Sequence, residues 1–547
     1  MIVFLQVFCA LFSALLTATA IPNEFLTFGS PFIGLFALVP LYICISSAKS
    51  FKIAGRLCSL QMGSVHLLTS FWLGNFKDFA VFTLGGSALV YFLWGYFWGQ
   101  LLYISISYTN KFKLKERAGT IQWSIPIRIF SFAAIWTIYE WYKSYGFLAY
   151  PWGTILMSAY KWKLVSQICD ITGTWGLSFL FALFNAVIAE GFLILKNNDF
   201  SKKYSSYAYV AGFCITLFVL STLYGVFQFS KTRTPNKTIT AVLVQQNADS
   251  WTEKPKNTIQ NLINLSKKEI NVNEAKGIKI DTVIMSESVL PFTLPENFGY
   301  YKHTPQKQSL IDFIEEKKIP FIIGCPHTLN YEKRQFCNAA NLFDQDFIQK
   351  KGDTNTWYGK IHLVPFAEGI PYAEKPWMQA LMNSFVGFSS SWAPGTTYTL
   401  FHLPLQNNTP QVKSTVAFTT PICFEDAFSD LCRALWKQGS EVFINLTNDS
   451  WSQTNSAEYQ HFVIASFRAI EMRTTLVRST NAGYSVVIDP AGRVLDDMPL
   501  FTTMAKTMTI PIYKRQLTTY CLLGDWLPLV LFILFSISSL FLIHYFL

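Results

Sequence analysis

Charged residues are scarce in this chain of 547 residues. They make up 14% of it, whereas hydrophobic residues make up 51%; a typical soluble domain is about one-quarter charged. This composition excludes a disordered or collagen-like chain and argues against a protein that is soluble throughout. Cysteine is also sparse, and ten cysteines in a chain of this length exclude a small disulfide scaffold.

Several common chemical signatures are missing as well. The sequence has no G-x-x-x-x-G-K-[ST], no H-E-x-x-H and no G-x-S-x-G. The seven histidines lack ligand spacing, so we expect no bound metal. No basic stripe with interleaved aromatic residues is present, so the net charge of +10 does not indicate a nucleic-acid partner. On an apolar chain such an excess is more typical of membrane orientation.

Long apolar runs are what the sequence has in abundance. A helix needs about 20 apolar residues to cross a bilayer, and eight segments qualify: 2–21, 25–47, 57–76, 79–108, 125–142, 171–194, 207–229 and 526–547. Ala18-Thr19-Ala20 resembles a signal-peptide cleavage site, but no Lys or Arg precedes the first run, which favours a retained span. We therefore predict a membrane bundle of seven spans in residues 1–230 and an eighth span in residues 521–547.

The distribution of Lys and Arg predicts how this bundle is oriented. The loops after the second, fourth and sixth spans are rich in them: Lys49, Lys52, Arg56, Lys111, Lys113, Lys115, Arg117, Lys196, Lys202 and Lys203. The alternate loops hold fewer: Lys77, Lys143, Lys161 and Lys163. Because Lys and Arg accumulate in cytoplasmic loops, both termini should be cytoplasmic, and residues 231–520 should lie on the outer face.

Residues 231–520 differ from the rest, because predicted strands alternate with predicted helices. The strands are Thr238–Gln245, Thr282–Ser286, Pro320–Gly324, Trp357–Val364, Ser414–Ile422, Glu441–Leu446 and Ser485–Asp489. The helices are Lys256–Glu269, Gln308–Lys317, Phe428–Lys437 and Ala457–Arg473. Such alternation predicts one α/β domain, inserted between the seventh and eighth spans.

Cys423 is the first candidate for chemistry in this domain. It closes an apolar predicted strand, and a helix is expected a few residues later. A thiol near a helix start is shifted toward the thiolate, which is the nucleophilic form. A buried structural cysteine is the alternative, but Glu425 and Asp426 follow at once, unlike a purely apolar core strand.

Glu287 and Lys360 occupy comparable places. Glu287 ends the predicted strand Thr282–Ser286, and Lys360 lies in the segment Trp357–Val364. Residues at strand ends face the crevice where α/β proteins bind ligands. If the three side chains converge there, the carboxylate takes the thiol proton, the ammonium stabilises the thiolate and a later oxyanion, and the sulfur attacks an acyl carbon.

These motifs resemble those of the apolipoprotein N-acyltransferases, within the nitrilase (carbon–nitrogen hydrolase) superfamily. Residues 360–368 (KIHLVPFAE) look like the family's lysine motif, and residues 421–425 (PICFE) look like its cysteine motif. Residues 445–451 (NLTNDSW) and 478–483 (RSTNAG) resemble its downstream blocks, and Pro151-Trp152-Gly153 also fits. The order of spans and inserted domain matches as well, so the resemblance covers nearly the whole chain.

The resemblance implies a four-layer αββα fold and a Glu-Lys-Cys triad. Glu287 would be the base, Lys360 the oxyanion partner and Cys423 the nucleophile. The supporting residues it implies are Glu368, Glu425, Phe424 and Trp251. This chain departs from the family pattern at Met285-Ser286 in place of Trp-Pro, at Phe424 in place of Tyr, and at Ala367 in place of Gly.

The segment Pro371–Trp392 is apolar and aromatic, and two interpretations stay open. It belongs to the core, or it forms an arm beside the site that meets the lipid surface and admits acyl chains. The residues of the hypothetical arm are Trp377, Met378, Phe385, Phe388 and Trp392.

The resemblance also implies the activity. Cys423 would take an acyl chain from a membrane phospholipid and pass it from a thioester to the N-terminal amine of a diacylglyceryl-cysteine apolipoprotein. No cofactor would be needed, and the protein would lie in a bacterial inner membrane with its catalytic domain in the periplasm. The alternatives are a membrane-anchored amidase using the same triad on a small amide, and a non-catalytic transporter or scaffold.

Overall fold

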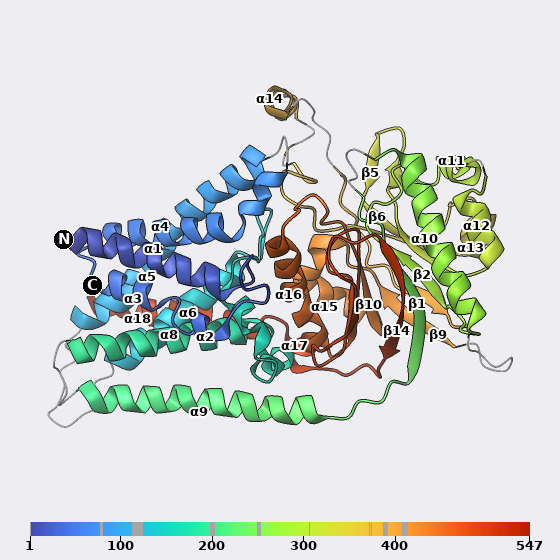
Figure 1. The fold of residues 1–547 in the computed structure, drawn as a ribbon. Coiled ribbons are helices and arrows are strands. Elements are labelled where there is room, and N and C mark those ends of the chain that lie inside the picture. The colour runs from blue at the N-terminus through green and yellow to red at the C-terminus, as the bar shows by residue number, and fades with distance from the viewer. Residues whose placement is uncertain are drawn as a thin grey trace.

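A computed structural model describes residues 2–76, 80–111, 124–196, 203–248, 253–305, 307–370, 372, 375–386, 392–406 and 414–546. Long helices gather at one end of the molecule, and two β-sheets with their covering helices form the other (Figure 1). The chain enters the sheet region after α9 and returns to the helical end in α18, so both ends of the α/β domain connect to apolar helices (Figure 1).

Apolar helices make up most of the first 230 residues. The long ones are α1 (Ile2–Ala20), α4 (Phe51–Thr69), α5 (Ser87–Lys111), α6 (Ser124–Tyr142), α8 (Trp175–Lys196) and α9 (Lys203–Ser230), with α18 (Trp526–Phe546) at the end of the chain. Four described segments are long and apolar enough to cross a membrane: Val3–Ala20, Val81–Ile106, Trp175–Lys196 and Ser205–Ser230. The chain is therefore a membrane protein.

The predicted span 25–47 is interrupted in the structure. It contains α2 (Pro31–Gly34) and α3 (Val39–Ser46), with turns between them. Pro40 has no N–H to donate to the carbonyl of Phe36 four residues earlier, which instead accepts from Val39 N at 3.1 Å. The apolar run is real, but proline prevents one continuous helix.

The α/β domain contains two six-stranded sheets. The first has the order β14-β1-β2-β3-β6-β7, with β14 (Met504–Ile512), β1 (Lys237–Gln245), β2 (Thr282–Met285), β3 (Phe321–Gly324), β6 (Ala339–Phe343) and β7 (Trp357–Gly359). The second has the order β13-β12-β11-β10-β9-β8, with β13 (Val494–Asp497), β12 (Val486–Ile488), β11 (Thr475–Thr480), β10 (Val442–Thr447), β9 (Thr415–Thr419) and β8 (Phe401–Pro404). A hairpin of β4 (His327–Asn330) and β5 (Gln335–Cys337) stands apart.

The two sheets pack face to face, with helices outside them. The inner faces meet at β1, β2, β11 and β14. Against the first sheet lie α10 (Pro255–Ala275), α11 (Phe298–His303), α12 (Leu310–Lys317) and α13 (Gln345–Gln349), and against the second lie α15 (Ser429–Lys437) and α16 (Asn455–Met472). The order of layers is helix, sheet, sheet, helix, as the resemblance implies.

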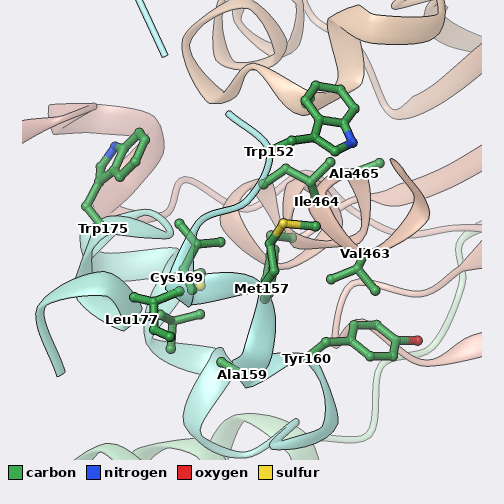
Figure 2. Close-up of a cluster of buried hydrophobic side chains, with 14 of the residues drawn as sticks. Trp152, Met157, Ala159, Tyr160, Cys169, Trp175, Leu177, Val463, Ile464 and Ala465 are labelled. Carbon is green, nitrogen blue, oxygen red and sulfur yellow. The ribbon is translucent and has the colours of Figure 1, made fainter. Parts of the chain in front are cut away.

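Helix α16 joins the domain to the helical bundle. All residues from Ser456 to Met472 except the half-buried Tyr459 are buried, because one side of the helix covers the second sheet and the other contacts the segments that follow α6. Figure 2 shows Val463, Ile464 and Ala465 of α16 beside Met157 and Tyr160 from the segment between α6 and α8. Buried apolar residues of α16 and of the segment between α6 and α8 belong to one hydrophobic cluster, so the two regions share one core.

We expect Ile464→Ala to destabilise this joint. The side chain is 2% exposed, and removing such a group costs about 2–5 kcal/mol in free energy of unfolding. Thermal unfolding of the purified protein in detergent should show a clearly lower midpoint. The matched control is Leu220→Ala in α9, where the side chain is 57% exposed. A midpoint equally unchanged in both variants would contradict the shared core.

Candidate active site

The candidate catalytic side chains meet at the ends of strands from both sheets. Glu287 follows β2, Lys360 follows β7, and Cys423 follows β9. All three line one cavity of about 630 Å³. Strands β2 and β9 each have a parallel neighbour in their own sheet, and the carboxyl ends of such strands are where α/β proteins bind ligands. The structure therefore brings together the three residues that the sequence singles out.

Two carboxylates share the Lys360 ammonium. Lys360 Nζ lies 3.1 Å from Glu287 Oε1 and 2.9 Å from Glu368 Oε1. The amide of Asn338 donates to the same two oxygens, at 2.7 and 3.1 Å, and Asn448 N donates to Glu287 Oε2 at 2.8 Å. Lys360 is 1% exposed, so these contacts replace its hydration.

Burial and nearby charges set the protonation of Lys360 and Glu287. Burial alone lowers the pKa of Lys360, but Glu287 and Glu368 raise it well above its usual range, so the ammonium keeps its charge. Burial raises the pKa of Glu287, and Lys360 opposes that shift. A carboxylate with a raised pKa that still pairs with a cation is well suited to accept and return a proton.

Cys423 differs from the sequence expectation in one respect. It begins only a short 3₁₀ turn, Cys423–Ala427, and α15 starts later, at Ser429. Burial, followed by the charge of Glu287, raises the pKa of the Cys423 thiol well above its usual value, with Lys360 opposing. The prediction of a thiolate stabilised by a helix start is therefore wrong, and the resting thiol needs a base.

The backbone at Cys423 is held in an uncommon conformation. Its φ is +50°, in the left-handed region that few residues other than glycine adopt. The Cys423 carbonyl accepts hydrogen bonds from Asn445 Nδ2 at 3.3 Å and from His461 Nε2 at 3.2 Å. These contacts fix the direction of the sulfur, as expected at a site where backbone strain persists.

Glu425 connects the loops that carry Cys423 and Lys360. One oxygen accepts from Ile361 N at 2.7 Å and His362 N at 3.0 Å, and the other accepts from Ile422 N at 2.7 Å. Tyr358 Oη donates to the same carboxylate at 3.0 Å. Burial raises its pKa to about 7, and these backbone hydrogen bonds oppose the shift. Glu425 thus acts on the site by positioning the two loops.

Phe424 and Trp152 form an aromatic wall beside Cys423. Their rings are parallel within 6°, with centroids 5.4 Å apart, and both line the cavity. Trp152 comes from the segment after α6, so this wall is built from both regions of the molecule. Trp251, the remaining supporting residue, lies outside the described residues.

The other face of the cavity is apolar and belongs to the helical region. It is lined by Trp72, Phe76, Phe82, Val90, Tyr91 and Leu148. The first two follow α4, and Phe82 lies in the π-helical turn Val81–Gly86 that leads into α5. The cavity therefore runs from the polar strand ends to helices that are apolar enough to contact lipid.

Helix α14 (Pro376–Val386) contains much of the hypothetical arm and stands away from the rest of the molecule (Figure 1). Trp377 is 58% exposed, Met378 is partly buried against Ile370, and Trp392 lines the cavity. Phe388 and the side chain of Phe385 lie outside the described residues. Exposure of α14 contradicts a core segment, and the arm interpretation stays a prediction.

Sequence reasoning missed several residues that border the site. Asn338 and His461 gave no local signal, because their contacts join segments far apart in the chain. Asp449 belongs to the recognised block after β10 but received no role. Among the described residues, no group of three His, Cys, Asp or Glu side chains is placed to hold a metal ion.

This geometry, with a cysteine, a lysine and a glutamate between two sheets, fits the class of carbon–nitrogen hydrolases. Residues 240–516 match the family model described as Carbon-nitrogen hydrolase. Residues 13–187 match the model described as Apolipoprotein N-acyltransferase N-terminal domain. Both parts of the molecule are thus similar to known families.

Three curated relatives agree over nearly the whole length. Apolipoprotein N-acyltransferase 2 of Treponema denticola is 40% identical and covers 97% of this chain and 96% of its own. Apolipoprotein N-acyltransferase 2 of Treponema pallidum is 38% identical over 96% of this chain and 92% of its own. The apolipoprotein N-acyltransferase of Borreliella burgdorferi is 30% identical over 97% and 95%. The chain belongs to the apolipoprotein N-acyltransferase family.

We expect Glu425→Gln to impair the site without unfolding the protein. The amide nitrogen would face a backbone N–H, leaving buried donors unpaired at a cost of about 1–3 kcal/mol, so both loops should shift. Thioester formation on Cys423, followed by intact-protein mass spectrometry, should fall sharply. Tyr358→Phe is the matched control, because it removes one donor and leaves the backbone contacts. Equal activity of Glu425→Gln and wild type would contradict the positioning role.

Proposed function

We propose that this protein transfers an acyl chain from a membrane phospholipid, through a Cys423 thioester, to the N-terminal amine of a diacylglyceryl-cysteine apolipoprotein. The observation that carries the proposal is the cavity, which has Glu287, Lys360 and Cys423 at one end and aromatic side chains of apolar helices at the other. A polar reaction centre with an apolar approach fits substrates whose reacting bond is attached to long acyl chains. The names of the relatives agree with this activity.

In the first half-reaction, Glu287 accepts the proton of the Cys423 thiol as the sulfur attacks the ester carbonyl carbon of the phospholipid. Lys360 stabilises the oxyanion, because its buried ammonium is already in place before charge develops. The carbon–oxygen bond then breaks, and the proton held by Glu287 goes to the departing glycerol oxygen. The products are the thioester and a lysophospholipid.

In the second half-reaction, the amine of the apolipoprotein attacks the thioester carbon. The carbon–sulfur bond breaks, an amide forms, and Cys423 regains its proton. The thioester divides one difficult transfer into two easier steps. The apolar walls restrict water, which would otherwise hydrolyse the intermediate. The arm residues Trp377, Met378, Phe385, Phe388 and Trp392 would contact lipid during exchange of the substrates, and Trp251 would support the site.

Placement in the membrane follows from the same proposal. The bundle of residues 1–230 would cross seven times and residues 521–547 once, with the domain of residues 231–520 in the periplasm of a bacterial inner membrane. Several contacts support the less apolar spans. The Arg128 guanidinium in α6 donates to Glu190 of α8 from Nε and Nη2, both at 2.7 Å, which satisfies two charges inside a bundle.

The amidase alternative has less support. A small soluble amide needs no route through Trp72, Phe76 and Phe82, and the relatives carry a different name. Release of a small acid from an amide, with no lysophospholipid formed, would be the observation in its favour.

Cys423→Ala should abolish transfer, because no other atom can carry the acyl chain between substrates. Incubation of wild type with a phospholipid should add the mass of one acyl chain at Cys423, and a diacylated lipopeptide should then remove it. Mass spectrometry of enzyme and peptide follows both steps. Lys360→Ala should block the first step, whereas Lys302→Ala, at a surface ion pair, is the control. Full transfer by Cys423→Ala would overturn the proposal.

The orientation predicts the behaviour of two reporter fusions. Alkaline phosphatase folds in the periplasm and green fluorescent protein fluoresces in the cytoplasm. A phosphatase fusion after residue 232 should be active, and a fluorescent fusion after residue 547 should be bright. The opposite pattern would show that the domain faces the cytoplasm, away from the exported acceptors.

A further inference from the structure

A second charged cluster lies beside Cys423. Its members are Asp426, Asp449, His461 and Arg478, and all are buried. His461 Nδ1 lies 2.7 Å from Asp449 Oδ2, and His461 Nε2 lies 3.0 Å from Asp426 Oδ1. Arg478 Nη1 donates to Asp426 Oδ2 at 2.8 Å. Two carboxylates thus alternate with two cationic side chains.

His461 is an imidazolium in this arrangement. Both ring nitrogens face acceptors: Nδ1 faces Asp449, and Nε2 faces Asp426 and, at 3.2 Å, the Cys423 carbonyl. Both nitrogens must therefore carry hydrogen. Burial lowers the pKa of His461, but Asp449 and then Asp426 raise it to about 9. The imidazolium in turn helps to keep Asp449 ionised: burial raises the pKa of Asp449, yet His461 and Arg478 hold it below its usual value.

The two oxygens of Asp449 have different surroundings. Oδ2 is occupied by His461, whereas Oδ1 faces the sulfur of Cys423 at 4.0 Å, and the residue lines the cavity. Within the part of the chain that the structure describes, the Cys423 thiol is the only hydrogen-bond donor to Oδ1. Acylation removes that hydrogen from the sulfur. Among the described residues, Oδ1 then has no protein donor, so it can accept from an N–H group that enters the cavity.

We infer that Asp449 binds the ammonium group of the acceptor in the second half-reaction, an inference that rests on the proposed function. The acceptor enters when Oδ1 has lost its donor, and it carries both positive charge and N–H groups. The reacting ester of the phospholipid has no hydrogen to donate, so Asp449 Oδ1 forms no hydrogen bond with it. Asp449 therefore distinguishes the second substrate from the first, and His461 is its positioning residue.

Glu287 is less suited to binding the ammonium, and it acts as the base instead. Its Oε1 already accepts from Lys360 and Asn338, and its Oε2 accepts from Asn448 N. With the ammonium on Asp449, one of its protons passes to Glu287 and is released, and the amine nitrogen attacks the thioester carbon. The second proton goes by way of Glu287 to the departing Cys423 sulfur. One ammonium and one thioester thus give one amide, one thiol and one proton.

The test measures the two half-reactions separately in the Asp449→Asn variant. The asparagine oxygen can still accept from His461, but the amide nitrogen then faces Cys423 and cannot bind an ammonium. Thioester formation from phospholipid should be as fast as in wild type or faster, because the Asp449 charge contributes to the raised pKa of the Cys423 thiol. Single-turnover transfer to a diacylated lipopeptide should fall by about tenfold or more, the loss expected for one charge-assisted hydrogen bond.

Cleavage of the thioester by hydroxylamine distinguishes a structural defect from loss of the ammonium site. A structural defect would change its rate, whereas loss of the ammonium site would not. Hydroxylamine is uncharged at neutral pH and cleaves thioesters without an ammonium site, so its rate on the acylated Asp449→Asn enzyme should equal that on wild type. Asp426→Asn is the matched control, because it alters the same cluster without lining the cavity and should affect the lipopeptide and hydroxylamine reactions alike. Equal loss of both reactions in Asp449→Asn, or no loss of either, would overturn the inference.

A second measurement uses wild type alone, in case the variant folds poorly. A diacylated lipopeptide with a dimethylated N-terminal amine keeps the charge and one N–H but cannot form the amide, and it should compete with the acceptor. The N-acetylated analogue is neutral and should compete at least about tenfold less well, if one charge-assisted hydrogen bond is missing. Equal competition would contradict an ammonium site. Absence of a thioester in wild type would instead contradict the proposed function itself.

Discussion

The contact between one buried ammonium and two carboxylates is the constraint on which the site depends. Lys360 lies between Glu287 and Glu368, so the group carries more negative than positive charge. Such a cluster is stable only where each oxygen and each N–H has a partner, and removal of one partner leaves an uncompensated buried charge. Asn338, Asn448 N and Val364 N provide these partners.

That charge balance also acts on the sulfur. Burial and then the negative charge of Glu287 raise the pKa of the Cys423 thiol, so the thiol needs a base to take its proton. An uncharged resting sulfur can remain beside the aromatic walls of the cavity.

The joint between domain and bundle makes the cavity possible. Helix α16 covers the second sheet, packs on the segment between α6 and α8 and also carries His461 (Figure 2). The strand ends alone would form an open crevice. The aromatic residues of the helical region close it on one side, so a polar reaction centre and an apolar approach belong to the same rigid core.

The sequence was informative where chemistry follows a buried strand. Cys423 and Glu287 could be chosen because each follows the end of an apolar run, and Lys360 because it interrupts the predicted strand Trp357–Val364. The carboxyl ends of parallel strands share an edge. The helix-and-strand alternation predicted the domain for the same local reason. Strands β11 and β14 escaped prediction because Arg478 and Lys506 break their apolar pattern, and the partner of Arg478, Asp426, lies far away in the sequence.

Long-range contacts explain what could not be predicted. Trp357–Val364 reads as one strand, yet β7 ends at Gly359, because the backbone N–H groups of Ile361 and His362 donate to Glu425 rather than to a neighbouring strand. The conformation at Cys423 likewise depends on Asn445 and His461.

The ring of Phe424 is fixed by stacking on Trp152. An apolar contact therefore holds the position beside Cys423. In the proposed transfer, a thioester must stay intact while one lipid leaves and another enters, and a ring without a hydroxyl group to hold water would favour this.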